Sequence, residues 1–289
     1  MKPHPPLCPG ATLCKERTVN SKIGPFELGT VHCVDCLEAM RELPNGSVPM
    51  IFTDPPYGHK NNDGDLIHNR EAALGKVKRV SASDARPIAN DDMASRDRVV
   101  QGMLREAARV LAPDCCCCCC CCCCGGGGPK PTFARAALEM DVAPLEFFHA
   151  VVWDKGGLGM GWRYRRNYEF VLVAKRKNGK LRWAWDGSGV ETANVVRIPK
   201  IIPANVEHPT VKPVELVRHF LRLHTYPGDL VLDPFAGSGT TGVACAEMGR
   251  AFLGFELDGH WVQVANERIE AARKGVTVNE LKAGQETLF

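Results

Sequence analysis

Long hydrophobic runs are absent from this sequence. No stretch approaches the ~18 consecutive apolar residues of a membrane-spanning helix, and the N-terminal MKPHPPLCPG lacks the apolar core of a signal peptide. An excess of one charge sign is also missing, because 36 Lys and Arg stand against 33 Asp and Glu. We therefore expect a cytoplasmic protein without a membrane partner. The net charge of +3 permits a nucleic-acid partner but does not require one.

Isolated cysteines are few, although the chain has 15 in total. Adjacent cysteines cannot form an ordinary disulfide network, because disulfide geometry is specific. A single CxxC supplies only two of the four ligands of a structural zinc site. We expect reduced thiols and no metal site. The cysteines form one run and five separate positions: Cys115–Cys124, Cys8, Cys14, Cys33, Cys36 and Cys245.

The cysteine run lies between two helical patterns, at residues 98–111 and 133–140. A turn at Pro113-Asp114 precedes the run and a glycine-rich turn follows it. Because a reduced cysteine behaves as a small hydrophobe, the run is predicted to form a buried parallel strand, which is typically a continuous apolar stretch. Two alternatives stay open at this point: a metallothionein-like metal trap and a translation artefact.

Strand-like and helical patterns alternate along most of the chain, which predicts an α/β doubly wound sheet. Residues 1–28 are predicted to be an irregular arm, residues 29–275 the folded domain and residues 276–289 a polar tail. Residues 59–92 are polar and without periodicity, and we expect a mobile loop there. Residues 155–206 contain a second irregular region.

One motif places a glycine turn between a strand and a helix. The apolar stretch DLVLD runs into FAGSGTT, where Gly237 and Gly239 allow the backbone to approach a ligand closely. Glu256 ends the next strand and is placed to bind the two ribose hydroxyls of a nucleoside. The alternative is that Glu256 caps the following helix. The lysine of a phosphate-binding loop is missing, which argues against an ATPase.

A second motif, TDPPYG, follows another apolar strand. Its consecutive prolines, Pro55 and Pro56, fix the backbone. The Asp54 carboxylate and the Pro55 carbonyl are thereby held as two acceptors, which suits an NH₂ group with its two donors. Tyr57 offers a flat face on which a base can stack. Taken alone, this motif could also be an ordinary turn.

Together with HPTVKP at residues 208–213, these motifs resemble the S-adenosylmethionine-dependent DNA amino-methyltransferases. The order, with the catalytic DPPY before the glycine turn, is similar to the circularly permuted β class, and the resemblance covers about residues 29–273. It implies a Rossmann-like seven-stranded methyltransferase sheet in which the strand Val31–Val34 lies beyond the Glu256 strand. The cysteine run departs from the family's mixed aliphatic strand, and little chain is left for a separate target-recognition domain.

The resemblance also implies site roles, with S-adenosyl-L-methionine as cofactor and Asp54, Pro55, Pro56 and Tyr57 as the catalytic loop. Lys212 would bind the methionine carboxylate or remain a solvated helix-start lysine. Asp233 would bind the methionine amino group or form a turn, and Asp35 would contact the cofactor adenine. The implied cofactor-binding residues are Asp35, Lys212, Asp233, Phe235, Gly237, Gly239, Thr240 and Glu256.

The implied reaction is site-specific transfer of a methyl group to the N6 amine of a flipped adenine in double-stranded DNA. Cytosine N4, RNA, a protein amide and a metal-sequestering or purely DNA-binding protein are the alternatives. A homodimer and a partner restriction nuclease are left open. Residues 155–206 are the candidate DNA-recognition region, where cationic residues are interleaved with tryptophans and suit phosphate contacts and stacking. The alternative is a solvated hairpin. The candidate DNA-binding residues are Arg163, Arg165, Arg166, Lys175 and Arg176.

Overall fold

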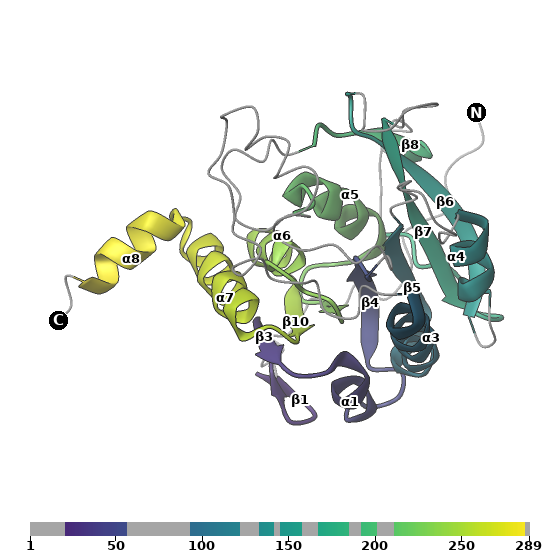
Figure 1. Cartoon of the computed structure of the whole chain (residues 1–289), viewed down its shortest axis with the longest axis horizontal. Coiled ribbons are helices and arrows are strands. Elements are labelled where there is room, and N and C mark those ends of the chain that lie inside the picture. The colour runs from purple at the N-terminus through teal and green to yellow at the C-terminus, as the bar shows by residue number, and fades with distance from the viewer. Residues whose placement is uncertain are drawn as a thin grey trace, which may run out of the picture.

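An eight-stranded sheet forms the centre of the computed structural model (Figure 1). The structure describes residues 21–56, 93–121, 133–141, 145–157, 167–184, 192–200 and 211–286. In spatial order, the strands are β3 (Thr30–Cys33), β10 (Ala251–Glu256), β9 (Leu230–Asp233), β4 (Val48–Thr53), β5 (Leu111–Cys121), β7 (Tyr168–Arg176), β6 (Leu145–Asp154) and β8 (Val195–Arg197).

The sheet is parallel except for β7, which runs against both of its neighbours, β5 and β6. The predicted Rossmann-like α/β class is confirmed. β3 pairs with β10 and therefore lies beyond the Glu256 strand, as the permuted order predicts. One difference is the strand number, because β8 adds a three-residue edge strand beside β6 to the seven expected.

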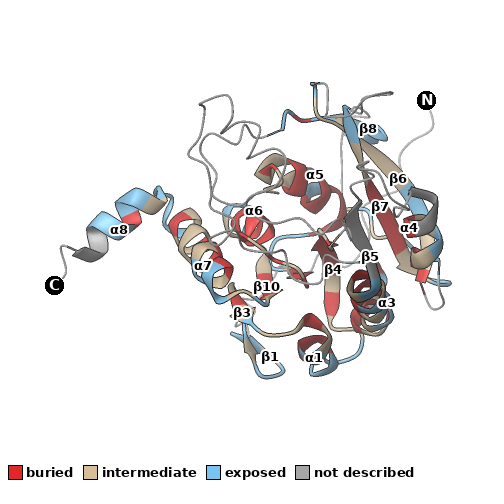
Figure 2. Cartoon of the chain, in the orientation of Figure 1, coloured by how far each residue is buried: buried red, intermediate tan, exposed pale blue. Residues whose placement is uncertain are grey.

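Helices cover both faces of the sheet and enclose two apolar clusters. Figure 2 shows the buried residues concentrated along the central strands and the helix faces turned toward them. The helices α1, α3 and α4 bury their apolar residues in one cluster, and α5, α6 and α7 bury theirs in the other. Their bounds are α1 (Cys36–Arg41), α3 (Met93–Val110), α4 (Phe133–Met140), α5 (Val214–His224), α6 (Thr240–Met248) and α7 (Gly259–Lys274).

The cysteine run forms most of β5, so the predicted strand is confirmed as far as Cys121. It pairs in parallel with β4 and antiparallel with β7. Cys115 and Cys116 are buried, and burial raises the pKa of the Cys115 thiol to about 11. The expected turn at Pro113-Asp114 is instead a register shift inside the strand. Proline has no N–H to donate to a ladder, which is why it is found at such bulges.

Both ends of the described chain are more regular than the sequence suggests. Residues 21–28, predicted to be irregular, contain the hairpin of β1 (Lys22–Ile23) and β2 (Phe26–Glu27), whose apolar side chains pack against the core. The expected polar tail contains α8 (Val278–Glu286), which extends away from the sheet in Figure 1. Leu281 is buried there and anchors α8. Single apolar residues among polar ones gave no periodic signal.

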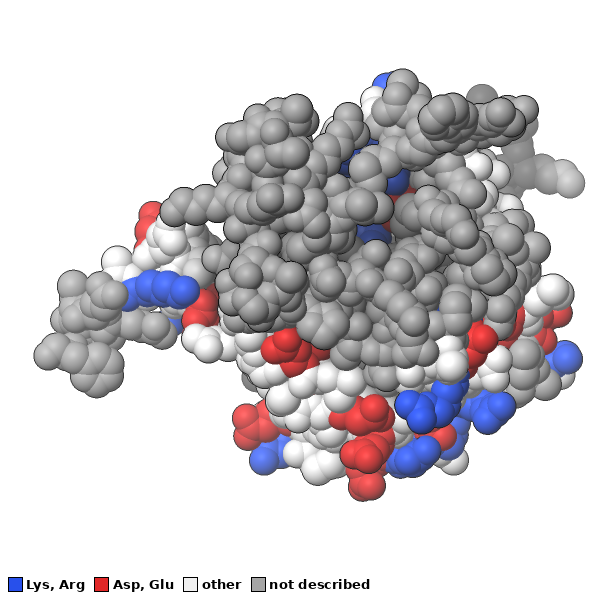
Figure 3. Space-filling model, viewed as in Figure 1, with Lys and Arg blue, Asp and Glu red and all other residues white. Residues whose placement is uncertain are grey.

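No helix in the described ranges is both long and apolar enough to cross a membrane. Charged residues of both signs are instead interspersed on the surface. In Figure 3 the lower part of the molecule carries Lys and Arg beside Asp and Glu. This agrees with the nearly balanced composition, and the described part of that face carries no broad field of one sign.

Candidate active site

Acidic residues gather at one edge of the sheet, the edge formed by the carboxyl ends of the parallel strands. Asp54 follows β4, Asp233 is the last residue of β9, Glu256 the last of β10, and Asp35 follows β3. These four strands are consecutive neighbours in the sheet. In open α/β sheets the carboxyl ends of the strands are where ligands bind. The structure therefore brings together the two motifs that the sequence separates by most of its length.

Asp233 is fully enclosed and links three elements at this edge. Its Oδ1 accepts from the Thr53 hydroxyl at 2.8 Å and from the Phe235 N–H at 3.1 Å. Its Oδ2 accepts from the Thr241 hydroxyl at 2.6 Å. Burial, reinforced by the charge of Asp54, raises the pKa of Asp233 to about 6 despite these three donors. The turn-forming alternative thus has direct support, because Asp233 joins β4, β9 and α6.

The raised pKa makes a testable contribution to stability. Between the unfolded pKa near 3.9 and the folded value of about 6, the folded chain binds more protons at Asp233. Stability from this group therefore falls as the pH rises. From pH 5 to pH 7, the wild type should lose about 1 kcal/mol of unfolding free energy relative to Asp233→Asn. Urea unfolding of both proteins without cofactor measures this, and a pH-independent difference would contradict it.

The glycine turn has the left-handed backbone that its residue type allows. Gly237 has φ +48° and Gly239 has φ +79°. Gly239 is the N-cap of α6, and no side chain caps this end of the helix, so N–H groups of its first turn remain available to a ligand. Thr240 is the first residue of α6 and is buried. Arg268 of α7 donates to the Ser238 carbonyl and, at 2.8 Å, to its hydroxyl, and so holds the turn.

Glu256 is bound to the glycine turn by its carboxylate. Oε2 accepts from the Gly237 N–H at 3.0 Å, and Oε1 accepts from the N–H groups of Leu257 and Asp258. Burial raises the pKa of Glu256. The helix-capping alternative is only partly realised, since Asp258 is the N-cap of α7. Asp35 is likewise the N-cap of α1, where both capping bonds use Oδ1.

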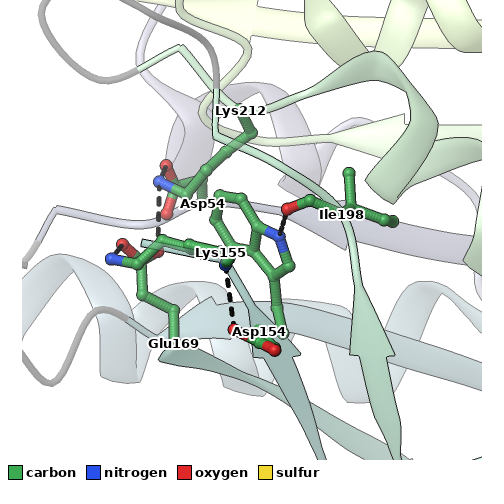
Figure 4. Close-up of polar contacts among 8 residues, drawn as sticks. Asp54, Asp154, Lys155, Glu169, Ile198 and Lys212 are labelled. Carbon is green, nitrogen blue, oxygen red and sulfur yellow. Dashed lines mark hydrogen bonds and ion pairs between the residues drawn. The ribbon is translucent and has the colours of Figure 1, made fainter. Parts of the chain in front are cut away.

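Lys212 contacts Asp54 of the TDPPYG motif. Its Nζ lies 2.5 Å from Asp54 Oδ2 and 3.9 Å from Glu169 Oε2 (Figure 4). Glu169 Oε1 also accepts from Lys155 Nζ at 2.8 Å. The side chains of Lys212, Glu169 and Lys155 are only 11 to 13% exposed. Lys212 lies just before α5, Glu169 lies in β7, and Lys155 directly follows β6. The cluster therefore lies on the β7 side of Asp54.

The other predicted residues divide into two groups. Lys175 and Arg176 are the last residues of β7, where Lys175 pairs with Cys116 of β5 and Arg176 with Leu145 of β6, away from the strand ends that carry Asp54 and Asp233. Lys175 donates to Glu146 and Arg176 to the Leu111 carbonyl. The structure therefore does not bring these two together with the motifs. The remaining predicted residues fall outside the described ranges: Tyr57, Arg163, Arg165 and Arg166.

Sequence reasoning missed four residues of this edge. Thr53 and Thr241 hold Asp233, and Glu169 and Lys155 extend the charge cluster. The two threonines stand directly beside the recognised motifs, which is a signal that could have found them. Glu169 and Lys155 gave no such signal, because a charged residue at a strand end is ordinarily solvated.

Comparison with known proteins agrees with this geometry. The family model described as DNA methylase, N6/N4 type, matches residues 48–267, which is most of the chain. The chain belongs to this family. It is 29% identical over 269 residues to the Type II methyltransferase M.XycI from Xanthomonas campestris pv. cyanopsidis, and the match covers 84% of this chain and 88% of that protein. The protein is therefore an S-adenosylmethionine-dependent DNA amino-methyltransferase.

Solved structures share the fold. The M1.HpyAVI–SAM complex superposes with a TM-score of 0.58 at 24% identity, covering 83% of this chain and 98% of that one. PvuII DNA methyltransferase, described as cytosine-N4-specific, gives a TM-score of 0.57 at 16% identity, covering 86% and 92% of the two chains. At these identities the likeness is one of fold.

The described residues suit S-adenosylmethionine chemically. A nucleoside with two ribose hydroxyls matches a carboxylate at a strand end, which Glu256 supplies beside the Gly237 N–H. The cofactor also carries positive charge, and Asp233 and Glu256 supply carboxyl groups beside the glycine turn. The first turn of α6 has no side-chain cap, so its N–H groups would suit an anionic group such as the cofactor's carboxylate.

Proposed function

We propose that this chain methylates the exocyclic N6 amine of adenine, at a specific site in double-stranded DNA. The observation that carries the proposal is the position of Asp54. It follows β4 directly beside β9, whose last residue begins the glycine turn. An amine held by Asp54 would therefore lie next to the cofactor edge. The Asp-Pro-Pro-Tyr version of the motif, in place of a Ser-Pro-Pro version, favours adenine over cytosine by family resemblance.

The chain's own residues would act by orientation. Asp54 and the Pro55 carbonyl accept the two hydrogens of the target NH₂ group, which favours a more tetrahedral and nucleophilic nitrogen. When bound, S-adenosylmethionine supplies a methyl group that its sulfonium already activates. Positioning of this kind can contribute about 7–11 kcal/mol to lowering a barrier. After transfer the nitrogen carries one excess proton, and Asp54 is the nearest proposed acceptor for it.

We assign the following roles to the residues that the family resemblance indicated. Glu256 would bind the ribose, Asp35 the cofactor adenine, and Phe235, Gly237, Gly239 and Thr240 would form the turn around the cofactor. Asp233 would hold that turn in place, because it accepts hydrogen bonds from Thr53, Phe235 and Thr241. Lys212 is assigned to the amine end of the site, since it contacts Asp54.

The test is nucleoside mass spectrometry after methyl transfer. Unmethylated DNA is incubated with the protein and S-adenosylmethionine carrying a heavy methyl group, and is then digested. We expect heavy N6-methyladenine. Heavy N4-methylcytosine would retain the mechanism and overturn the assignment of the base. Absence of label in DNA, with cofactor binding intact, would direct the search to RNA or protein amides.

DNA contacts outside the described ranges are also part of the proposal. Arg163, Arg165 and Arg166, with Tyr57 as the stacking residue, are proposed to contact the substrate; Lys175 and Arg176 are not retained. The sequence left two partners open, a second copy of this chain and a cognate restriction nuclease. Light scattering of the purified protein at several concentrations would measure the first.

A further inference from the structure

We propose that Glu169 is a positioning residue for methyl transfer, acting through Lys212. In this role Glu169 draws the Lys212 ammonium away from Asp54 when the target amine arrives. The proposal rests on the proposed role of Asp54 as acceptor of the amine hydrogens. It starts from a conflict in the structure, since the Asp54 carboxylate that should receive the amine already accepts from Lys212, through Oδ2 at 2.5 Å.

Glu169 provides the alternative acceptor. Its Oε2 is buried, and no donor in the described part of the chain hydrogen-bonds to it, whereas Oε1 is satisfied by Lys155 at 2.8 Å. A buried carboxylate oxygen without a donor is costly and is usually satisfied in some state of the protein. Lys212 Nζ stands 3.9 Å from this oxygen.

The required movement is small. Lys212 must shift by roughly 1 Å for its Nζ to reach hydrogen-bond distance from Glu169 Oε2. The lysine side chain is flexible and its ammonium has three donors, so it can serve both carboxylates in turn. Figure 4 shows Lys212, Asp54 and Glu169 gathered in one cluster. Without substrate, Lys212 keeps Asp54 paired; with substrate, the amine replaces Lys212 at Asp54 and Lys212 pairs with Glu169.

Charge is conserved in this exchange, which supports its feasibility. Asp54 and Glu169 stand against Lys212 and Lys155, so no net charge enters or leaves the cluster. Neutralising Glu169 removes this charged acceptor and favours the pairing of Lys212 with Asp54. The amine then competes with an ammonium for the Asp54 carboxylate, which slows transfer without altering the cofactor-binding edge.

The experiment is single-turnover methyl transfer to unmethylated DNA with labelled S-adenosylmethionine, counting methyl groups on adenine and cytosine together. Glu169→Gln keeps the shape and the acceptor for Lys155, and we expect it to slow transfer about 10- to 100-fold, the scale of a misplaced group. The dissociation constant of the cofactor should not change. Glu146→Gln is the matched control, because it also removes a charge from a Lys–Glu pair, but at the opposite end of the sheet.

Two variant backgrounds identify the route of the effect. In the Lys212→Met background, Glu169→Gln should lower the rate of methyl transfer by less than about twofold, because the residue through which Glu169 acts is gone. In the Lys155→Met background, Glu169→Gln should slow methyl transfer by the same factor as in the wild type. Equal costs in the wild-type and Lys212→Met backgrounds, or loss of the effect in Lys155→Met, would overturn the proposal.

Glu169→Asp keeps the charge near Lys212 and should recover most of the lost rate. This variant decides the question even if Glu169→Gln does not fold, since an Asp variant that is folded but slow would rule out the charge as the cause. If the wild type itself transfers no methyl group to DNA, the proposed function fails instead. An error in the base alone would leave this test unaffected, because both amines are counted.

Discussion

Asp54→Ala should lower the rate of methyl transfer by about 10²–10³, the loss expected when one preorganised polar partner of the reacting group is removed. The carboxylate follows β4 at the edge where Asp233 and Glu256 end their strands. Its removal takes away an acceptor for the target amine but leaves the glycine turn and the Glu256 contacts intact. The dissociation constant of S-adenosylmethionine should therefore stay near that of the wild type. The measurement is single-turnover transfer together with cofactor titration.

Two further variants separate the effects of Asp54. Asp54→Asn keeps an acceptor oxygen but removes the charge that holds Lys212, so its rate should lie between wild type and Asp54→Ala. Asp114→Ala is the control, because Asp114 is exposed and accepts only a backbone N–H, that of Lys180, among the contacts described for it. Near-normal turnover of a folded Asp54→Ala protein would refute the mechanism.

Gly239→Ala should destabilise the protein by about 2–5 kcal/mol. Two causes add here: a left-handed backbone costs a non-glycine residue about 1–2 kcal/mol, and overpacking costs about 1–3 kcal/mol. Gly239 has φ +79°, and a Cβ placed on it would lie 2.8 Å from the Ala265 Cβ and 2.9 Å from the Ala265 Cα. Backbone of α7 cannot move aside as a flexible side chain can. Urea unfolding measures the loss.

Gly249 provides a matched control at the other end of the same helix. It has φ +67°, but no atom lies within 4 Å of a Cβ built on it. Gly249→Ala should therefore cost only the backbone strain, about 1–2 kcal/mol. The difference between the two variants isolates the close approach of α6 and α7. Equal losses would show that Gly239 is required for its backbone conformation alone.

Gly239 has a packing role that the sequence did not predict. The motif FAGSGTT predicted a turn in which glycines let a ligand approach, and the left-handed φ of Gly237 and Gly239 agrees with such a turn. The contact with Ala265 was not predicted, because it joins positions that are distant in the sequence and depends on how α7 packs on α6. A glycine can thus be required by the fold and available to a ligand at the same time.

Asp233 and Lys212 show the same division. The sequence placed Asp233 at the end of the strand before the glycine turn and Lys212 ahead of that strand, and Asp233 is indeed the last residue of β9. Their partners could not be predicted from the sequence, because they are distant along the chain. Asp233 accepts from Thr53 of β4, and Lys212 contacts Asp54 and Glu169. Each pairing depends on which strands become neighbours in the sheet and on which face their side chains lie.

Local patterns in the sequence by themselves determined the alternation of strands and helices, the glycine turn and the strand formed by the cysteine run. Such patterns suffice because periodicity, turn residues and strand ends are properties of neighbouring positions. The tertiary structure alone decided that Lys212 lies between Asp54 and Glu169, that Asp233 ties β4 to β9 and α6, and that Lys175 and Arg176 lie away from the strand ends that carry Asp54 and Asp233. Those contacts are made by side chains brought together through the order and direction of the strands.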